Sequence, residues 1–193
     1  MAAFAGPEAA AGVVTLDQPA LNPSWEADLS LLSPGAAVST LGFSPLSISE
    51  LTALNATVTT DSGTNEITAE GWWRLKGTTT TLAFDHTLGS VWFEFAHEKT
   101  ASVEVAFLDA GGGVLDTVTL DGKVTPSGSV SFTTGVGESV TSVRLTWTKA
   151  AGHAMLLGPT LDVTPSDSVV PGPGVLALVG AGAGLALLRR RRG

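Results

Sequence analysis

Short runs in which apolar and polar side chains alternate are the feature that most restricts the fold of this chain. In VWFEFAH, residues 91–97, every second residue is apolar, while Trp92 and Glu94 fall between them. Side chains of a β-strand point alternately to opposite faces of a sheet, so this period of two indicates a strand with one face in a core. The same period recurs in SVEVAFLD, residues 102–109, and in SVRLTWT, residues 142–148. The residues expected in the core are Phe93, Phe95, Val103, Val105, Phe107, Leu145 and Trp147.

Further runs rich in Thr, Val and Phe, such as ALNATVTT, TTTTLAF and SVSFTT, are separated by the turn sequences DSG, AGGG, LDG, PSG and GVG. Residues of these types favour strands and turns respectively, and no stretch before residue 166 shows a sustained helical period. The pattern predicts an all-β fold over residues 12–165, an antiparallel β-sandwich of jelly-roll type.

Charge is unevenly distributed along the chain. Residues 1–188 hold six of the ten basic residues and all eighteen acidic ones, so their net charge is −12. Such a surface repels nucleic-acid phosphates and other polyanions, which argues against nucleic-acid binding. The chain contains no cysteine, and this excludes disulfides, thiol catalysis and cysteine metal sites.

The C-terminal sequence differs from the rest. Residues 174–188 are fifteen uncharged small or apolar residues, about 22 Å of helix, which suits either a buried core helix or a short membrane span. The four arginines that follow favour the membrane span, because basic residues directly after an apolar run stay on the cytoplasmic side. We therefore expect a linker at 166–173, a single transmembrane helix at 174–188 and a basic cytoplasmic tail at 189–193. The membrane stop consists of Arg189, Arg190, Arg191 and Arg192.

A proline motif, a helix of small residues and leucine, and a terminal arginine cluster together resemble the PEP-CTERM sorting signal. The motif residues are Val170, Pro171, Gly172 and Pro173, with Gly172 where the family's namesake motif has glutamate. The stretch VEVAFLDAGGGVLDTVTL is also similar to the bodies of such proteins. The resemblance implies export, an inner-membrane-anchored precursor, and processing by an exosortase, a membrane-embedded cysteine protease. It implies a final place at the cell surface or in the extracellular matrix.

The N-terminal residues 1–11 read as the remnant of a signal peptide or as a disordered terminus. Ala3, Phe4 and Ala5 form an A-x-A-like cleavage site, but no basic region and no apolar core precede it.

Residues capable of catalysis or metal binding are scattered. His86, His97 and His153 show no metal-ligand spacing, and no G-x-S-x-G motif occurs. Glu94 and Glu104 are a candidate glycosidase pair if their strands are adjacent. We expect no enzyme activity, no cofactor and no metal, although oxygen ligands for Ca²⁺ are present in the turn and end residues Asp17, Asp109, Asp116 and Asp162.

Tryptophans suggest a binding surface. Trp72 and Trp73 are adjacent in an expected strand, so one indole points inward and the other outward. Trp72, Trp73 and Trp92 are candidate glycan contacts, because an outward indole stacks well on a sugar ring. The alternative is that the outward indole is covered by the segment around Trp25, or that it packs beside Trp92. The sequence therefore favours a non-enzymatic surface or matrix protein, with a carbohydrate-binding module as the alternative and a glycan-active enzyme as the third class. The expected partners are the exosortase, the membrane, and neutral polysaccharide or further copies of the chain.

Overall fold

The computed structural model describes residues 11–18, 25–46, 54–61, 65–75, 77–97, 102–147 and 155–166. Within these ranges the chain forms twelve strands, all paired antiparallel, and its one helical element is the short 3-10 turn η1 at Leu29–Leu31. The prediction of an all-β antiparallel fold is confirmed. The strands are β1 (Val13–Leu16), β2 (Trp25–Asp28), β3 (Thr40–Pro45), β4 (Leu54–Thr60), β5 (Glu66–Ile67), β6 (Trp73–Leu75), β7 (Thr79–His97), β8 (Ser102–Leu108), β9 (Val114–Asp121), β10 (Ser127–Thr133), β11 (Val140–Trp147) and β12 (Met155–Pro165).

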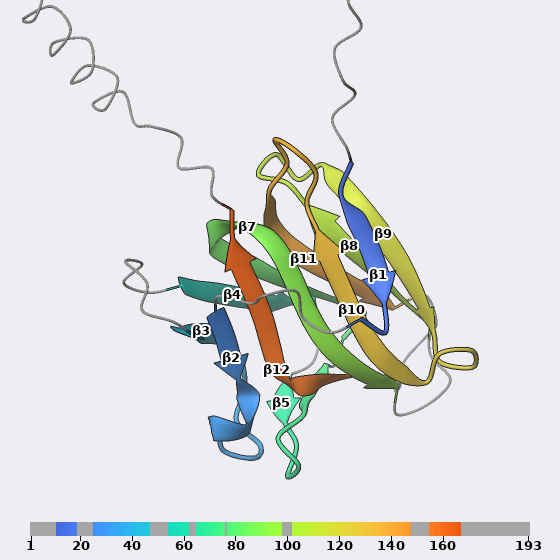
Figure 1. Ribbon diagram of the computed structural model, residues 1–193. Helices are drawn as coiled ribbons and strands as arrows, with labels where there is room; N and C mark the ends of the chain where they lie inside the picture. The colour runs from blue at the N-terminus through green and yellow to red at the C-terminus, as the bar shows by residue number, and fades with distance from the viewer. Residues whose placement is uncertain are drawn as a thin grey trace, which may run out of the picture.

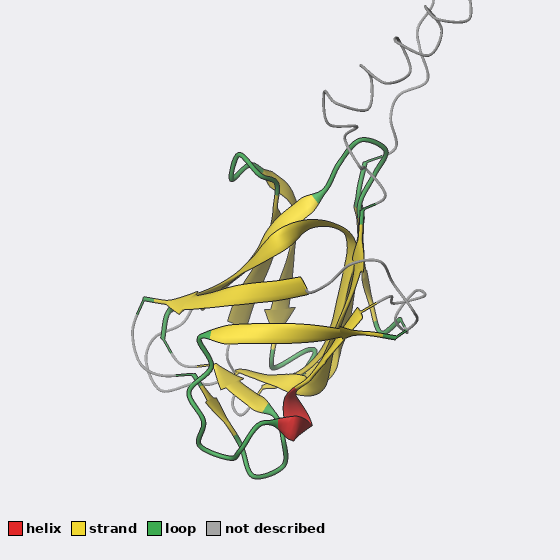
Figure 2. Ribbon diagram, turned by 90° about the vertical axis from the view of Figure 1, so that its left-hand side faces the viewer, coloured by secondary structure: helices red, strands yellow, loops and turns green. Residues whose placement is uncertain are grey.

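The strands form two layers that share the long strand β7 (Figure 1). One layer, which we call the groove layer, contains β2, β12, residues 90–97 of β7, β10 and β1. The opposite layer contains β3, β4, residues 79–88 of β7, β11, β8 and β9. Figure 2 shows the strands from the side, around a common interior, with η1 at one end.

Strand β7 changes partners at its middle, and this change joins the layers. Its first half pairs with β4 and β11, and its second half pairs with β10 and β12. The register with β11 jumps from Ala83 to Leu88, so the residues between them have no partner on that strand. The sequence predicts two separate runs here, TTTTLAF and VWFEFAH, whereas the structure has one strand of 19 residues.

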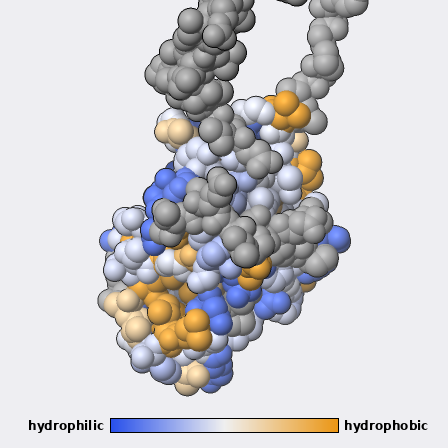
Figure 3. Space-filling model, turned by 60° about the vertical axis from the view of Figure 1, so that its left-hand side comes forward, coloured by the Kyte–Doolittle hydropathy of each residue, from blue (hydrophilic) through white to orange (hydrophobic). Residues whose placement is uncertain are grey.

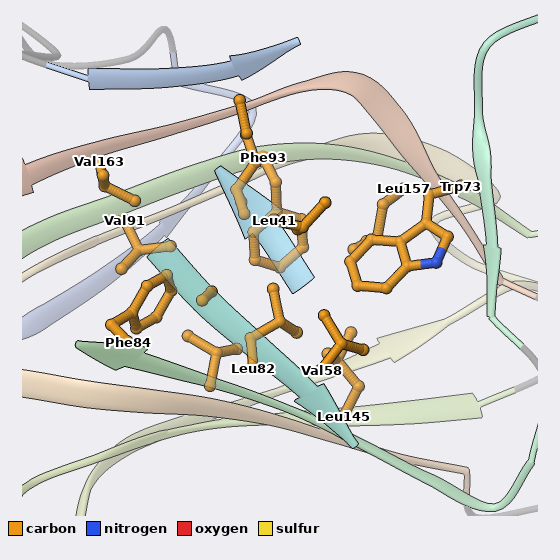
Figure 4. Packing of buried hydrophobic residues seen from close by; sticks show 14 of the residues in the cluster. Leu41, Val58, Trp73, Leu82, Phe84, Val91, Phe93, Leu145, Leu157 and Val163 are labelled. Carbon is orange, nitrogen blue, oxygen red and sulfur yellow. The ribbon is translucent and has the colours of Figure 1, made fainter. Parts of the chain in front are cut away.

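The core lies between the layers and contains residues of both. Phe107 of β8 stacks on Phe132 of β10 with ring centroids 4.4 Å apart. The indole of Trp73 points into the same cluster, beside Leu157 (Figure 4). The small gap among residues such as Leu82 and Phe93 has no room for a water molecule. The interior is therefore dry and closely packed, as in most protein cores.

Most of the predicted core is confirmed. Six of the seven expected residues are at most 2% exposed, and the seventh, Trp147, is half-buried and packs against the cluster. The alternation succeeds because an apolar residue at every second position can occupy only one face of a strand. Trp147 differs because it is the last residue of β11, at the margin of the layer.

Several predicted segments lie outside the described residues. These are residues 1–10, the sorting motif Val170–Pro173, the expected helix 174–188 and the basic tail 189–193. Within the described ranges, no helix is both long enough and apolar enough to cross a bilayer.

Candidate functional site

An open groove with a volume of about 580 Å³ lies on the outer side of the groove layer. It combines two indoles, two carboxylates and two serine hydroxyls, which come from four separate segments of the chain. This is the mixture of flat apolar surface and hydrogen-bonding groups that small-molecule sites display. Its lining residues are Asp17, Gln18, Trp72, Trp92, Glu94, Phe95, Ser127, Gly128 and Ser129.

The floor of the groove is set by the pairing of β7 with β10. Glu94 pairs with Ser129, and Trp92 pairs with Ser131. Directly opposite residues of antiparallel strands share a face, so these side chains all point to the outer side. Phe93 and Phe95 point inward and are buried. The alternation that builds the core therefore also presents Trp92 and Glu94 to solvent, as predicted.

The two adjacent tryptophans separate between the core and the groove. Trp73 is fully buried, whereas Trp72 is half-buried and lines the groove. A turn fixes Trp72: its N–H donates to Thr68 Oγ1 at 3.1 Å, and its carbonyl accepts from Thr68 N at 2.7 Å. The expectation of one inward and one outward indole is confirmed. The assignment of Trp73 to a glycan contact is corrected, because its ring is enclosed by the core.

The end of β1 closes one side of the groove. Trp92 Nε1 donates to the Gln18 carbonyl at 2.7 Å, and Ser129 Oγ donates to the same oxygen at 3.0 Å. These bonds fix the indole of Trp92 in the groove. Asp17 has a φ of 54°, the left-handed region that non-glycine residues adopt infrequently. Aspartate is one of the few non-glycine residues that tolerate this region, most often in turns.

Two glycines make room for the two carboxylates of the groove. A Cβ at Gly158 would lie 2.6 Å from Glu94 Cβ, and a Cβ at Gly128 would overlap Asp17 Oδ1. Gly158 lies in an irregular part of β12, where residues 158–160 oppose Glu94 alone. A glycine inside a strand often marks such a close approach. Both carboxylates thus occupy space that any other residue at these glycines would fill.

Asp162 adds a further carboxyl group on the same outer face. It pairs with Trp92 on one side and with Glu26 of β2 on the other. Its side chain is buried, and Oδ1 has no hydrogen-bond partner among the described residues. Burial, and then repulsion by Glu26 and Glu94, raise the pKa of Asp162 to about 6. This face therefore carries negative charge that the protein itself leaves uncompensated.

The other candidate residues do not assemble into a site. Glu104 pairs with Thr119 and Thr146 in the opposite layer, so the proposed pair of Glu94 and Glu104 across adjacent strands is wrong. The partner of a strand is decided by the whole topology, which alternation alone does not reveal. No group of three metal-ligating side chains occurs within the described ranges.

The histidines are likewise separate. His86 Nδ1 lies 2.7 Å from Asp85 Oδ1 on the exposed middle part of β7. His97, at the other end of the strand, has both ring nitrogens buried without a described partner, and burial lowers its pKa. His153 lies outside the described residues.

The turn aspartate Asp109 is occupied by its own loop. Its Oδ1 accepts from the N–H groups of Gly111 and Gly113 at 2.8 and 2.7 Å. This carboxylate shapes the hairpin between β8 and β9, which is the turn role that the residue type favours.

Exposed apolar side chains are found elsewhere on the surface. Figure 3 shows one hydrophobic patch in the lower part of the molecule, next to hydrophilic residues. Leu31 and Leu32, in and after η1, are 81% and 37% exposed. These residues contribute no polar group to the groove, whose lining is confined to the strands and turns described above.

Sequence reasoning missed Asp17, Gln18 and Ser127–Ser129 as parts of one site. They lie more than 100 residues apart along the chain and meet only through the pairing of β1 with β10. The signal available in the sequence was the pair of isolated glycines, Gly128 and Gly158, inside strand-like stretches. No protein-family model and no curated protein sequence matches this chain.

Proposed function

We propose that this chain is an exported, non-enzymatic cell-surface protein whose β-domain, a sandwich of jelly-roll type, binds polysaccharide in the groove. The observation that supports binding most strongly is the convergence of Trp72 and Trp92 on one open groove with hydroxyl and carboxylate groups. Sugar rings present apolar faces to indoles and hydroxyl groups to polar side chains. The groove offers both kinds of contact at once.

Hydrogen bonds order parts of both tryptophans before a ligand arrives. The indole N–H of Trp92 donates to the Gln18 carbonyl, and the backbone of Trp72 is held by the turn at Thr68. A side chain that is already ordered loses less conformational entropy on binding. Ser127 and Ser129, together with Asp17 and Glu94, supply hydrogen-bonding groups for sugar hydroxyls.

The test is a titration of the full-length protein with β-1,4-linked hexasaccharides, in which calorimetry and tryptophan fluorescence measure binding. Trp72→Ala should lower the affinity about tenfold, or about 1.4 kcal/mol, because one stacking surface is lost. Trp147→Phe is the matched control, since Trp147 belongs to β11 of the opposite layer. If no hexasaccharide changes the fluorescence or gives a binding heat, the groove is not a glycan site.

Export and sorting are proposed from the C-terminal sequence. The support is the order of Val170–Pro173, the apolar residues 174–188 and the four arginines. In the native host, carbonate-washed membranes should retain a precursor of the chain. Replacing the four arginines by serine should reduce this retention, because the stop signal is removed. A precursor that never fractionates with membranes contradicts the proposed sorting route, whatever the groove binds.

A further inference from the structure

We propose that the groove selects polysaccharides that carry free amino groups, such as partly deacetylated amino sugars, over neutral ones. This inference rests on the proposed glycan-binding function and names the class of ligand for the same groove. It follows from the charge of the groove, the faces of its indoles and the way its carboxylates are placed.

The lining of the groove is negatively charged. Asp17 and Glu94 line the groove, and the described lining residues include no lysine or arginine. No hydrogen bond or ion pair joins Glu94 to another described residue, in contrast to Glu66, which pairs with Arg74 at 2.9 Å. A carboxylate without a positive partner favours a ligand that brings a cation.

The neighbouring Asp162 adds a carboxyl group on the same outer face. Its side chain is 7% exposed, and Oδ1 has no hydrogen-bond partner among the described residues. It shares the outer face with Trp92 and Glu94, and burial, followed by repulsion from Glu26 and Glu94, raises its pKa. A cation in the groove would relieve this repulsion, whereas a neutral sugar would leave it unchanged.

The two indoles of the groove also favour a cation. An ammonium group near the face of an indole is attracted by the ring quadrupole, and Trp is the strongest side chain in this respect. Trp72 and Trp92 border the same space as the two carboxylates. A sugar ring with an ammonium substituent therefore matches the indoles through both its apolar face and its charge.

The backbone next to the two carboxylates contains two glycines and one left-handed residue. Gly158 leaves space for Glu94, and Gly128 leaves space for Asp17, whose own φ is 54°. General surface acidity needs none of these adjustments. The backbone of β12 and β10 instead leaves room for the side chains that carry the two carboxylates.

The experiment compares three ligands with the same β-1,4-linked backbone: a glucosamine hexamer, an N-acetylglucosamine hexamer and cellohexaose. Titrations use the full-length protein at pH 6.5 and low salt, where most of Asp162 is ionised and the free amines still carry part of their charge. We expect the glucosamine hexamer to bind at least tenfold more tightly than either neutral hexamer, and we expect this advantage to shrink as sodium chloride is added.

Charge-removing variants identify the residues responsible. Glu94→Gln and Asp17→Asn should each remove most of the preference for the amino hexamer, because the affinity for the amino hexamer falls more than the affinity for the neutral hexamers. Glu104→Gln is the matched control, because Glu104 lies on β8 in the opposite layer. Circular dichroism of each variant verifies folding, and either groove variant alone is sufficient for the test.

Each other outcome overturns the inference in a distinguishable way. Equal or tighter binding of the neutral hexamers contradicts selection for amines but leaves the glycan groove intact. An equal loss in Glu104→Gln shows attraction by overall charge rather than by the groove. A lysine hexapeptide that binds as tightly as the glucosamine hexamer identifies basic peptide as the ligand class. If none of the hexasaccharides binds, the proposed function itself is wrong.

Discussion

The two faces of the groove layer are built from the same strands, but one is apolar and buried and the other is charged. On the inner face, Phe93, Leu161 and Val163 are at most 2% exposed and pack into a dry core. On the outer face, the next residues along the same strands are Glu94 and Asp162, which share a region of unbalanced negative charge. The inner face stabilises the fold, whereas the outer face carries charge at some expense of stability.

A turn of the opposite layer contains a carboxylate whose hydrogen bonds come from within the turn. Asp61 accepts hydrogen bonds from the N–H groups of Thr78 and Thr79, both at 2.9 Å, and from the Thr78 hydroxyl. The Thr78 hydroxyl is the main cause that lowers the pKa of Asp61 to about 2. Asp61 and Asp162 are thus the same residue type with pKa shifts of opposite sign, because donors stabilise the charge of Asp61, whereas burial and then repulsion by two glutamates disfavour the charge of Asp162.

The largest difference is expected between the adjacent tryptophans. Trp73→Ala should lower the free energy of unfolding by about 3 to 5 kcal/mol, because it leaves a cavity in the core. Trp72→Ala should cost less than about 1.5 kcal/mol, since its ring is half-exposed in the groove, but should weaken glycan binding. Urea denaturation of both variants measures this difference. Similar losses of stability would show that the outer face also carries the fold.

The next effect concerns the space left for Glu94. Gly158→Ala should destabilise the protein by about 1 to 3 kcal/mol, because the new Cβ overlaps Glu94 Cβ. Gly42→Ala on β3 is the matched control: its nearest neighbour would be Asn55 Oδ1 at 3.7 Å, an ordinary contact. A Gly158→Ala protein as stable as Gly42→Ala in the same urea series would mean that Glu94 is not held in place by this contact.

A smaller effect, of opposite sign, is expected at Asp162. Its pKa is about 6 in the folded protein against an ordinary value of 3.8, so the cost of its charge is absent below pH 3.8 and complete above pH 6. Asp162→Asn should therefore raise the free energy of unfolding by about 1 kcal/mol at pH 7.5 and change little at pH 4, after allowance for screening by solvent. Thermal unfolding across this pH range measures the effect, and a loss of stability at pH 7.5 would refute the assigned repulsion.

The smallest effect is expected at Asp61. Because its pKa is lower in the folded protein, its contribution to stability is present above pH 3.8 and is lost as pH falls through about 2. Asp61→Asn should slightly lower the melting temperature at neutral pH, whereas Asp162→Asn should raise it. Melting temperatures at pH 7.5 suffice for this comparison. An increase for both variants would remove the distinction between the turn and the groove face.

The sequence predicts the inner face better than the outer face, and the reason is physical. Alternation along β7, β8 and β11 is a local property, so it identifies Phe93, Val103 and Leu145 as core residues without any knowledge of pairing. The groove depends on which strands become neighbours. Asp17 and Gly128 meet through the pairing of β1 with β10, and the irregularity at Gly158 sets the space for Glu94. Such long-range pairings leave no periodic pattern in the sequence.

The most direct test of the glycan-binding groove uses the five tryptophans as separate reporters. In ¹H–¹⁵N spectra of the full-length protein, each indole N–H gives its own signal, and the glucosamine hexamer is added stepwise. We predict that the signals of Trp72 and Trp92 move together and saturate at the same ligand concentration, while those of the buried Trp25 and Trp73 stay in place. Signals that all remain unchanged, or a response limited to Trp147 on the opposite layer, would contradict the glycan-binding groove.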